Sequence, residues 1–294
     1  MKQFFGLLLV GLMAAPAAAQ ITIDGTKEAG YGSALAVQTV ETQFGDNASE
    51  WNAGYAMIDA GRLYLMLTGN LEANFNKLEI FIDSKAGGQS VFDSAGNDNS
   101  NRMDGLKFDV GFTADYHLIA RRGSSKFDLD FADLGAQTSN VYENVFAGAD
   151  AGSGNTSTGV NGSPIGVAYN GSNIAGVLGG TAAADQTAAQ AVTTGLELSI
   201  ALSDLGYVNG PINVMVGQNG SGHDYFSNQF LGGLVAPQGN LGGDGSGNFT
   251  GVAPIDFTSF AGNQFFTVRG IPEPASLGLA SLASVAALMI RRRK

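Results

Sequence analysis

Apolar side chains recur at every second position in six short stretches of the chain, and no other feature limits the possible folds as much. Successive side chains of a β-strand point to opposite faces of a sheet, so this alternation predicts strands that each turn one face to a core. The stretches are residues 63–67, 78–83, 106–110, 127–131, 196–202 and 212–216. Together they predict an all-β fold.

Turn-forming residues between these stretches favour an antiparallel β-sandwich or jelly roll. The chain has 43 glycines among its 294 residues, with many Asn, Ser and Thr, which suits numerous turns and long polar loops. A hairpin turn is expected at residues 59–61, a short helix within 181–192 and a flexible surface loop at 148–163. We expect one domain over residues 20–270, a length that buries a substantial core without disulfides.

The N-terminal stretch has the organisation of a secretory signal peptide. Lys2 supplies a positive charge, residues 4–13 are apolar, and Ala17 and Ala19 offer a small-residue cleavage site. Such a segment is removed on export and takes no part in the fold. We therefore assign residues 1–19 to a signal peptide, with a buried N-terminal helix as the alternative.

Residues 271–294 combine three parts in a fixed order. Pro272, Glu273 and Pro274 form a short rigid motif, and residues 275–290 follow without a single charge. The basic end consists of Arg291, Arg292, Arg293 and Lys294. An apolar helix of about 16 residues spans roughly 24 Å, slightly less than a membrane-crossing helix needs, and long cationic side chains extend its reach. These parts predict a single C-terminal transmembrane helix with a cytoplasmic basic end; a buried core helix is the alternative.

This order of parts resembles the PEP-CTERM sorting signal of exported proteins in Gram-negative bacteria, with a match over residues 272–294. The resemblance implies that an exosortase, a membrane enzyme, recognises the tail and cleaves near the Pro-Glu-Pro motif. It further implies transient residence in the inner membrane, followed by delivery to the cell surface or extracellular matrix beside exopolysaccharide. A permanently anchored protein with an uncut tail is the alternative.

The expected body is strongly acidic. Five of the 15 basic residues and one of the 26 acidic residues lie outside residues 20–270, which leaves a net charge near −15. Such a surface repels phosphate backbones, so nucleic acid is not an expected partner. The chain has no cysteine and therefore no disulfides.

Residues 23–25, which read Ile-Asp-Gly, and residues 197–206 resemble the β-sandwich of family 9 carbohydrate-binding modules and their DOMON-like relatives. The resemblance implies a sugar-binding sandwich over much of residues 20–231. The pair of tryptophans with which such modules clamp a sugar is not matched, because Trp51 is the only Trp. Other aromatic candidates for stacking on sugars are Tyr64, Phe81, Tyr116, Tyr142, Tyr225 and Phe226.

Carboxylate and amide oxygens are concentrated in residues 93–105, which suits a hard cation such as Ca²⁺ with its ~6–8 oxygen ligands. The candidate ligands are Asp93, Asn97, Asp98, Asn99, Asn101 and Asp104, joined by Asp83 at the end of the preceding expected strand. The alternative is a solvated loop in which Asn and Asp side chains stabilise turns.

No catalytic motif is recognisable in the sequence. His117 and His223 are the only histidines, and we expect ordinary strand or loop residues rather than zinc ligands. Arg121 and Arg122 are expected as exposed charges at a strand end, with a carboxylate or sulfate site as the alternative. We therefore predict a non-enzymatic surface or matrix protein associated with exopolysaccharide. A secreted glycan-active enzyme is the alternative, because paired carboxylates from distant strands leave no local motif.

Overall fold

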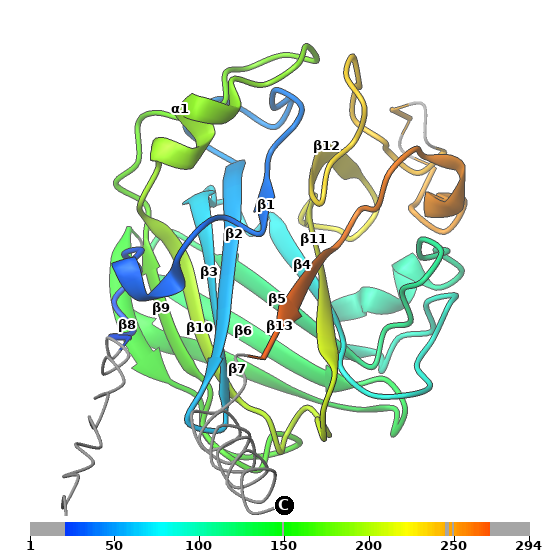
Figure 1. Cartoon of the computed structure of the whole chain (residues 1–294). Coiled ribbons are helices and arrows are strands. Elements are labelled where there is room, and N and C mark those ends of the chain that lie inside the picture. The colour runs from blue at the N-terminus through cyan, green and yellow to red at the C-terminus, as the bar shows by residue number, and fades with distance from the viewer. Residues whose placement is uncertain (1–20, 149, 245–246, 249, 271–294) are drawn as a thin grey trace, which may run out of the picture. The chain divides into compact units, whose positions relative to one another are not determined.

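Two antiparallel β-sheets form the body of the chain, as the alternation of apolar side chains predicts (Figure 1). The computed structural model describes residues 21–148, 150–244, 247–248 and 250–270. The stretch Ile21–Ile271 forms one compact unit. The predicted signal peptide (residues 1–19) and the predicted sorting signal (residues 271–294) lie outside the described residues.

The first sheet begins with a hairpin of two long strands. In spatial order its six strands are β1 (Ala36–Val37), β2 (Glu50–Asp59), β3 (Arg62–Asn70), β10 (Gly195–Ala201), β9 (Gly166–Asn170) and β8 (Ala151–Asn155). Ala60 and Gly61 link β2 to β3 with φ values of 46° and 75°, the left-handed geometry of a two-residue hairpin turn. The predicted turn at residues 59–61 is confirmed.

The second sheet contains the longest continuous meander of the chain. Its strands, in spatial order, are β12 (Phe226–Leu231), β11 (Pro211–Asn219), β4 (Lys77–Asp83), β5 (Tyr116–Arg122), β6 (Lys126–Asp133) and β7 (Thr138–Ala147). A short strand, β13 (Phe266–Arg269), also pairs with β11. All these pairings are antiparallel, as a chain of hairpins and meanders allows.

The main apolar core lies between the two sheets. Leu63, Leu65 and Leu67 of β3 face it from the first sheet and have no exposed surface. Ile80 of β4 and Leu118 of β5 meet them from the second sheet and are equally buried. The alternating residues of the predicted strands therefore supply this core, as expected.

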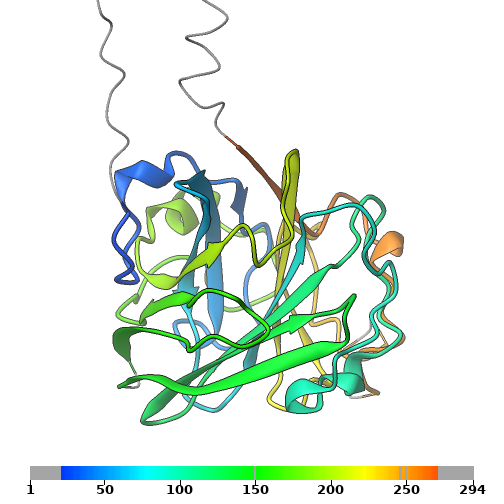
Figure 2. The same cartoon turned by 90° about the horizontal axis from the view of Figure 1, so that it is seen from below.

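A second apolar core covers the outer face of the second sheet. Two long segments, residues 88–114 and 232–265, supply this cover, and Figure 2 shows them side by side as teal and orange stretches. The ring of Phe81 on β4 lies 4.9 Å from that of Phe108, between centroids. The prediction of a strand at residues 106–110 is wrong, because only two isolated bridges form there, both at Lys107. Alternation suits any extended segment that lays one face on a sheet, so it does not identify a strand by itself.

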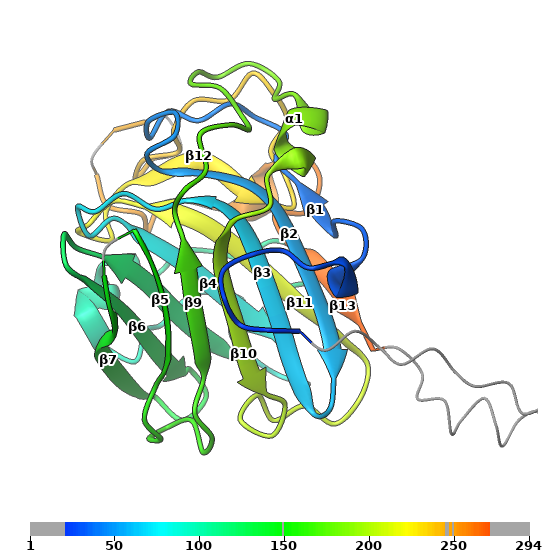
Figure 3. The same cartoon turned by 90° about the vertical axis from the view of Figure 1, so that its left-hand side faces the viewer.

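The outer face of the first sheet carries a smaller apolar cluster under the N-terminal stretch. Figure 3 looks onto this face, where the dark-blue stretch that follows Ile21 crosses β3 and β10. Ile21 and Tyr31 pack there against Tyr55 and Met66. Short 3₁₀ helices complete the fold: η1 (Ala29–Tyr31), η2 (Asn97–Met103) and η3 (Phe257–Ser259).

Two local predictions have different outcomes. The short helix expected within residues 181–192 is α1 (Gln186–Ala191), and the Asp185 carboxylate caps it by accepting from the backbone N–H groups of Thr187 and Ala188. The prediction of a flexible loop at residues 148–163 is wrong in part, because β8 lies within it and pairs with β9. The sequence of β8, Ala-Gly-Ser-Gly-Asn, has no large apolar side chain whose alternation could indicate a strand.

Candidate functional site

Two of the six aromatic side chains proposed for sugar stacking line hollows in the surface and are only half-buried. Tyr225 lines one hollow and Tyr64 lines another. The other four lie in the cores and are at most 8% exposed: Phe81, Tyr116, Tyr142 and Phe226. Trp51 is also a core residue, with 1% of its surface exposed. Of the six candidates, Tyr225 and Tyr64 are therefore the two that line a hollow with a half-exposed ring.

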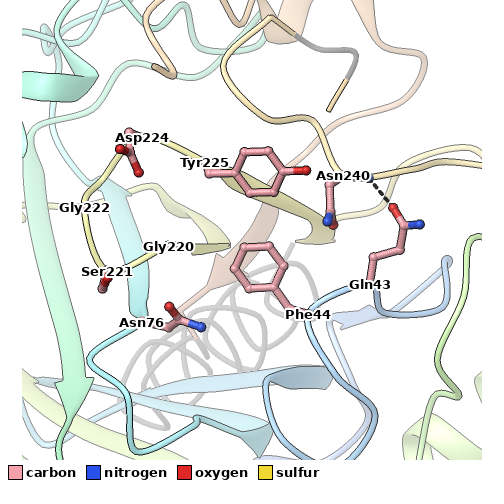
Figure 4. Close-up of a pocket in the computed structure, with 9 residues that line it drawn as sticks. All are labelled: Gln43, Phe44, Asn76, Gly220, Ser221, Gly222, Asp224, Tyr225 and Asn240. Atoms are coloured by element: carbon pink, nitrogen blue, oxygen red, sulfur yellow. Dashed lines mark hydrogen bonds between the residues drawn. The ribbon is translucent and has the colours of Figure 1, made fainter. Parts of the chain in front are cut away.

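The hollow at Tyr225 has a volume of about 400 Å³ and lies where four loop segments meet (Figure 4). The loop between β1 and β2 contributes Gln43 and Phe44. Asn76 is the residue directly before β4. Asn240 comes from the segment that follows β12. The loop between β11 and β12 supplies the remaining lining residues: Gly220, Ser221, Gly222, Asp224 and Tyr225.

Phe44 and Tyr225 form the aromatic part of this hollow. Their rings are nearly parallel, with an angle of 6° between planes and 6.0 Å between centroids. Figure 4 shows the rings side by side, with Gln43 and Asn240 on one side and Asp224 on the other. The Tyr225 hydroxyl donates to the carbonyl oxygen of Gly247 at 2.9 Å, which fixes the ring in place. Phe44 has no signal in the sequence, because it lies outside the alternating stretches.

Asn228 on β12 holds the loops around the hollow in position. Its amide nitrogen donates to the carbonyl oxygens of Glu41, Gly180 and Gln238, at 2.7, 3.2 and 2.8 Å. Its side-chain oxygen accepts from the backbone N–H of Gln43 at 3.1 Å. Asn228 has no exposed surface, so these bonds are shielded from water. The position of the loop that bears Phe44 thus depends on one buried amide.

The chemistry of the hollow suits an uncharged ligand rich in hydroxyl groups. Aromatic faces bind the apolar faces of a ligand, and amide side chains both donate and accept hydrogen bonds. Gln43, Asn76 and Asn240 supply such amides beside the two rings. Among the described lining residues there is no Lys or Arg, and Asp224 is the single carboxylate. This combination of a few polar groups with an apolar surface is typical of small-ligand sites.

A buried ionic network lies directly behind the hollow, and its centre is Glu79 on β4. The Glu79 carboxylate has no exposed surface and accepts from His117 Nε2 at 2.8 Å and from His223 Nδ1 at 2.7 Å. It also accepts from Asn219 Nδ2 at 3.1 Å, and the Asn219 oxygen accepts from the backbone N–H of Tyr225 at 3.1 Å. A continuous chain of hydrogen bonds therefore links Glu79 to the backbone of Tyr225.

Asp98 of η2 connects this network to the segment that covers the sheet. Its Oδ2 atom lies 2.6 Å from Lys77 Nζ, 3.3 Å from His223 Nε2 and 3.4 Å from Arg121 Nη1. Arg121 continues to Asp130 of β6, where Nη1 and Oδ1 are 2.6 Å apart. Arg121 is only 6% exposed, so the expectation of an exposed charge at this position is wrong. A network of this kind offers no signal in the sequence, because its members lie on four strands, on η2 and in the loop between β11 and β12.

The charges of the network perturb one another strongly. Burial alone would lower the pKa of His223, but the Glu79 charge and the hydrogen bonds to Asp98 and Glu79 raise this pKa to about 9. Burial would raise the pKa of Asp98, but its bonds from His223 and Lys77 and the Arg121 charge lower this pKa to about 2. Despite complete burial, the two imidazoles hold the pKa of Glu79 well below its usual range. At neutral pH His223 is therefore an imidazolium between two carboxylates.

We expect the stability of the protein to fall as the pH rises from 6.5 toward 9. The pKa of His223 is about 9 in the folded state and near 6.5 in the unfolded state, so its stabilising effect is complete below 6.5 and is lost as the pH passes 9. A shift of this size corresponds to about 3 kcal/mol. Melting temperatures of the wild type and His223→Gln should converge across this range. Curves that stay parallel would contradict the assignment.

The predicted calcium ligands make separate contacts in the structure. Asp98 is paired with cationic side chains, and the Asn97 amide donates to Asp130 at 3.0 Å. Asp104 accepts from the backbone N–H of Ser94. The remaining candidates divide into Asp83, which accepts from Asn213, and the side chains of Asp93, Asn99 and Asn101, which make no hydrogen bond to another described residue.

Within the described ranges, no group of three or more His, Asp or Glu side chains is placed to hold a metal ion. Calcium binding stays a prediction, and its expected result is a melting temperature that EDTA lowers and added Ca²⁺ restores. A melting temperature that EDTA leaves unchanged would count against it.

The part of the chain that the structure describes contains no helix that is both long and apolar enough to cross a membrane. The residues of the predicted sorting signal, Pro272, Glu273, Pro274, Arg291, Arg292 and Arg293, lie outside that part. Comparison of the chain with protein-family models, with curated proteins and with solved structures finds no match.

Proposed function

We propose that this chain is an exported, non-enzymatic surface or matrix protein whose β-sandwich body binds a neutral polysaccharide. The observation that carries the proposal is the hollow in which the parallel rings of Phe44 and Tyr225 lie among amide side chains, with no Lys or Arg among the described lining residues. Sugar rings have apolar C–H faces that stack on aromatic rings, while their hydroxyl groups bond to amides. The open hollow also suits a polymer, which must continue past the residues that hold it.

The two ends of the sequence support export. A signal peptide at residues 1–19 directs the chain across the membrane, and the tail at residues 271–294 resembles a signal that an exosortase cleaves. The apolar helix of residues 275–290 holds the chain in the inner membrane until cleavage releases the body to the cell surface. Mass spectrometry of the protein from its native host should find a C-terminal peptide that ends near Pro272. A peptide that ends at Lys294 would instead indicate permanent anchoring.

The lining of the hollow favours binding over hydrolysis. Glycoside hydrolases use two carboxyl groups on opposite sides of the bond that they cleave, roughly 5–10 Å apart. Asp224 is the single carboxylate among the described lining residues. Glu79, the closest further acid in the hydrogen-bonded chain to Tyr225, has no exposed surface and is occupied by two imidazoles.

The test is equilibrium binding of the purified full chain to a panel of soluble neutral polysaccharides, with analysis of the products after long incubation. The proposal predicts saturable binding of at least one neutral polymer and no new reducing ends. Release of shorter sugars would establish the alternative, a glycan-active enzyme. Absence of binding to every neutral polymer, with the chain folded, would contradict the proposal.

A further inference from the structure

A second hollow, separate from the first, lies on the outer face of the first sheet. Its volume is about 510 Å³. Its lining residues come from β3, β8, β9 and β10, from Pro164 before β9 and from the N-terminal stretch; Figure 3 looks onto this face of the sheet. Its lining residues are Ile21, Ile23, Arg62, Tyr64, Ser153, Gly154, Asn155, Pro164, Gly166 and Ser199. The two hollows have no described lining residue in common.

Among the described residues that line this hollow, Arg62 is the only charged one, and its guanidinium is held in one orientation. Its Nε donates to Ser199 Oγ at 2.6 Å, and its Nη2 donates to the carbonyl oxygens of Ser199 and Pro164 at 2.7 and 3.0 Å. These three bonds leave Nη1 without a partner among the described residues. A guanidinium fixed in advance loses little conformational freedom when it binds a carboxylate.

No carboxylate of the described chain neutralises Arg62. Asp59 lies opposite it across the β2–β3 hairpin, yet no ion pair joins the two side chains. Glu197 lies two residues before Ser199 on β10, but its carboxylate accepts from Tyr31 and from the backbone N–H of Gly25 under the N-terminal stretch. Arg62 therefore has no counterion among the described residues, in a body whose net charge is near −15.

The other polar side chains of the hollow also have unused hydrogen-bonding capacity. The Tyr64 hydroxyl, the Ser153 hydroxyl and the Asn155 amide make no hydrogen bond to another described residue. Tyr64 is half-buried: its side chain packs against the apolar cluster on the sheet and also lines the hollow. A fixed cation, an aromatic ring and three free polar groups thus surround one space.

We propose that this second hollow binds a carboxylate-bearing sugar, a uronic acid residue of an acidic polysaccharide. Nη1 of Arg62 keeps both of its N–H groups free for a ligand and forms charge-assisted hydrogen bonds to a carboxylate. Tyr64 stacks on the sugar ring, and Ser153 and Asn155 bond to its hydroxyl groups. This ligand class differs from that of the neutral hollow, so the inference does not depend on the function proposed above.

The test measures binding of galacturonate trimers to the purified full chain by isothermal titration calorimetry. The expected result is saturable binding that weakens at high salt, because an exposed ion pair is screened, and that falls about tenfold or more in Arg62→Gln. Arg62→Lys should keep part of the affinity, because it keeps the charge but loses the planar donor. The uncharged maltotriose should not compete.

Two controls make the result specific. Arg269→Gln removes the same charge from another arginine that has no carboxylate partner among the described residues, and it should bind uronate as the wild type does. Tyr225→Ala should also keep uronate binding, since it alters only the neutral hollow.

The inference is overturned if Arg62→Gln, shown to be folded by its melting temperature, binds galacturonate as tightly as the wild type. It is equally overturned if Tyr225→Ala abolishes that binding. If the chain binds galacturonate but no neutral polymer, the proposed function is contradicted and this inference stands.

Discussion

Glu79→Ala should reduce the free energy of unfolding by about 3–5 kcal/mol, the usual effect of removing one partner from a buried ion pair. The Glu79 carboxylate is completely buried and accepts hydrogen bonds from His117, His223 and Asn219. Without it, the imidazolium of His223 loses its nearest counterion, and two further donors lose their acceptor. Urea denaturation at pH 6.5, where His223 is charged, measures the difference.

The matched control for this substitution is Glu143→Ala on β7 of the same sheet. Glu143 has 70% of its side chain exposed, and its contact with Lys126 is long, at 3.7 Å. Such a surface pair contributes about 0–1 kcal/mol. Glu79→Gln keeps the shape and an acceptor but loses the charge, so an intermediate loss is expected. A change below 1 kcal/mol in Glu79→Ala would mean that the network does not stabilise the fold as described.

Removing the rings of Phe44 and Tyr225 should weaken binding of the neutral polysaccharide by about tenfold for each ring. The two rings provide the aromatic surface of the hollow, so each substitution to alanine leaves the sugar without part of its apolar support. Tyr225→Phe should bind nearly as the wild type does, because it keeps the ring. Calorimetry with the polymer identified by the binding panel measures these effects.

Tyr64→Ala is the matched control for the aromatic substitutions. Tyr64 is also a half-buried tyrosine that lines a hollow, but a different one. It should leave the affinity for the neutral polymer unchanged. Loss of that affinity in Tyr64→Ala, with full retention in the double variant Phe44→Ala and Tyr225→Ala, would place the neutral site in the second hollow.

The sequence predicts the inner layer of the fold well and its outer layer poorly. The alternation of Leu63, Leu65 and Leu67 identifies β3, because one face of that strand is buried between the sheets. On β4 and β6 the opposite face is buried too, so Glu79 and Asp130 resemble solvent-facing residues in the sequence but have no exposed surface. The covering segments are held by non-local contacts, and the alternation at residues 106–110 marks an extended segment on the sheet rather than a strand.

The candidate site is predicted only in part for the same reason. Tyr225 stands out as a tyrosine in a polar loop, and the structure places it in a hollow. Phe44 and Asn228 carry no such signal, since their roles depend on segments far away along the chain: Asn228 bonds to Glu41, Gly180 and Gln238. Arg62 looks like an ordinary residue after a hairpin turn, and only the fold shows that Ser199 and Pro164 hold its guanidinium in the lining of a hollow.

Saturation-transfer NMR of the purified full chain with an oligosaccharide of the bound neutral polymer tests the central claim most directly. Irradiation of the aromatic protons should transfer magnetisation to the C–H protons on one face of the sugar, because those protons lie against Phe44 and Tyr225. The double variant Phe44→Ala and Tyr225→Ala should lose this transfer, whereas Tyr64→Ala should retain it. An unchanged pattern of transfer in the double variant would contradict the account.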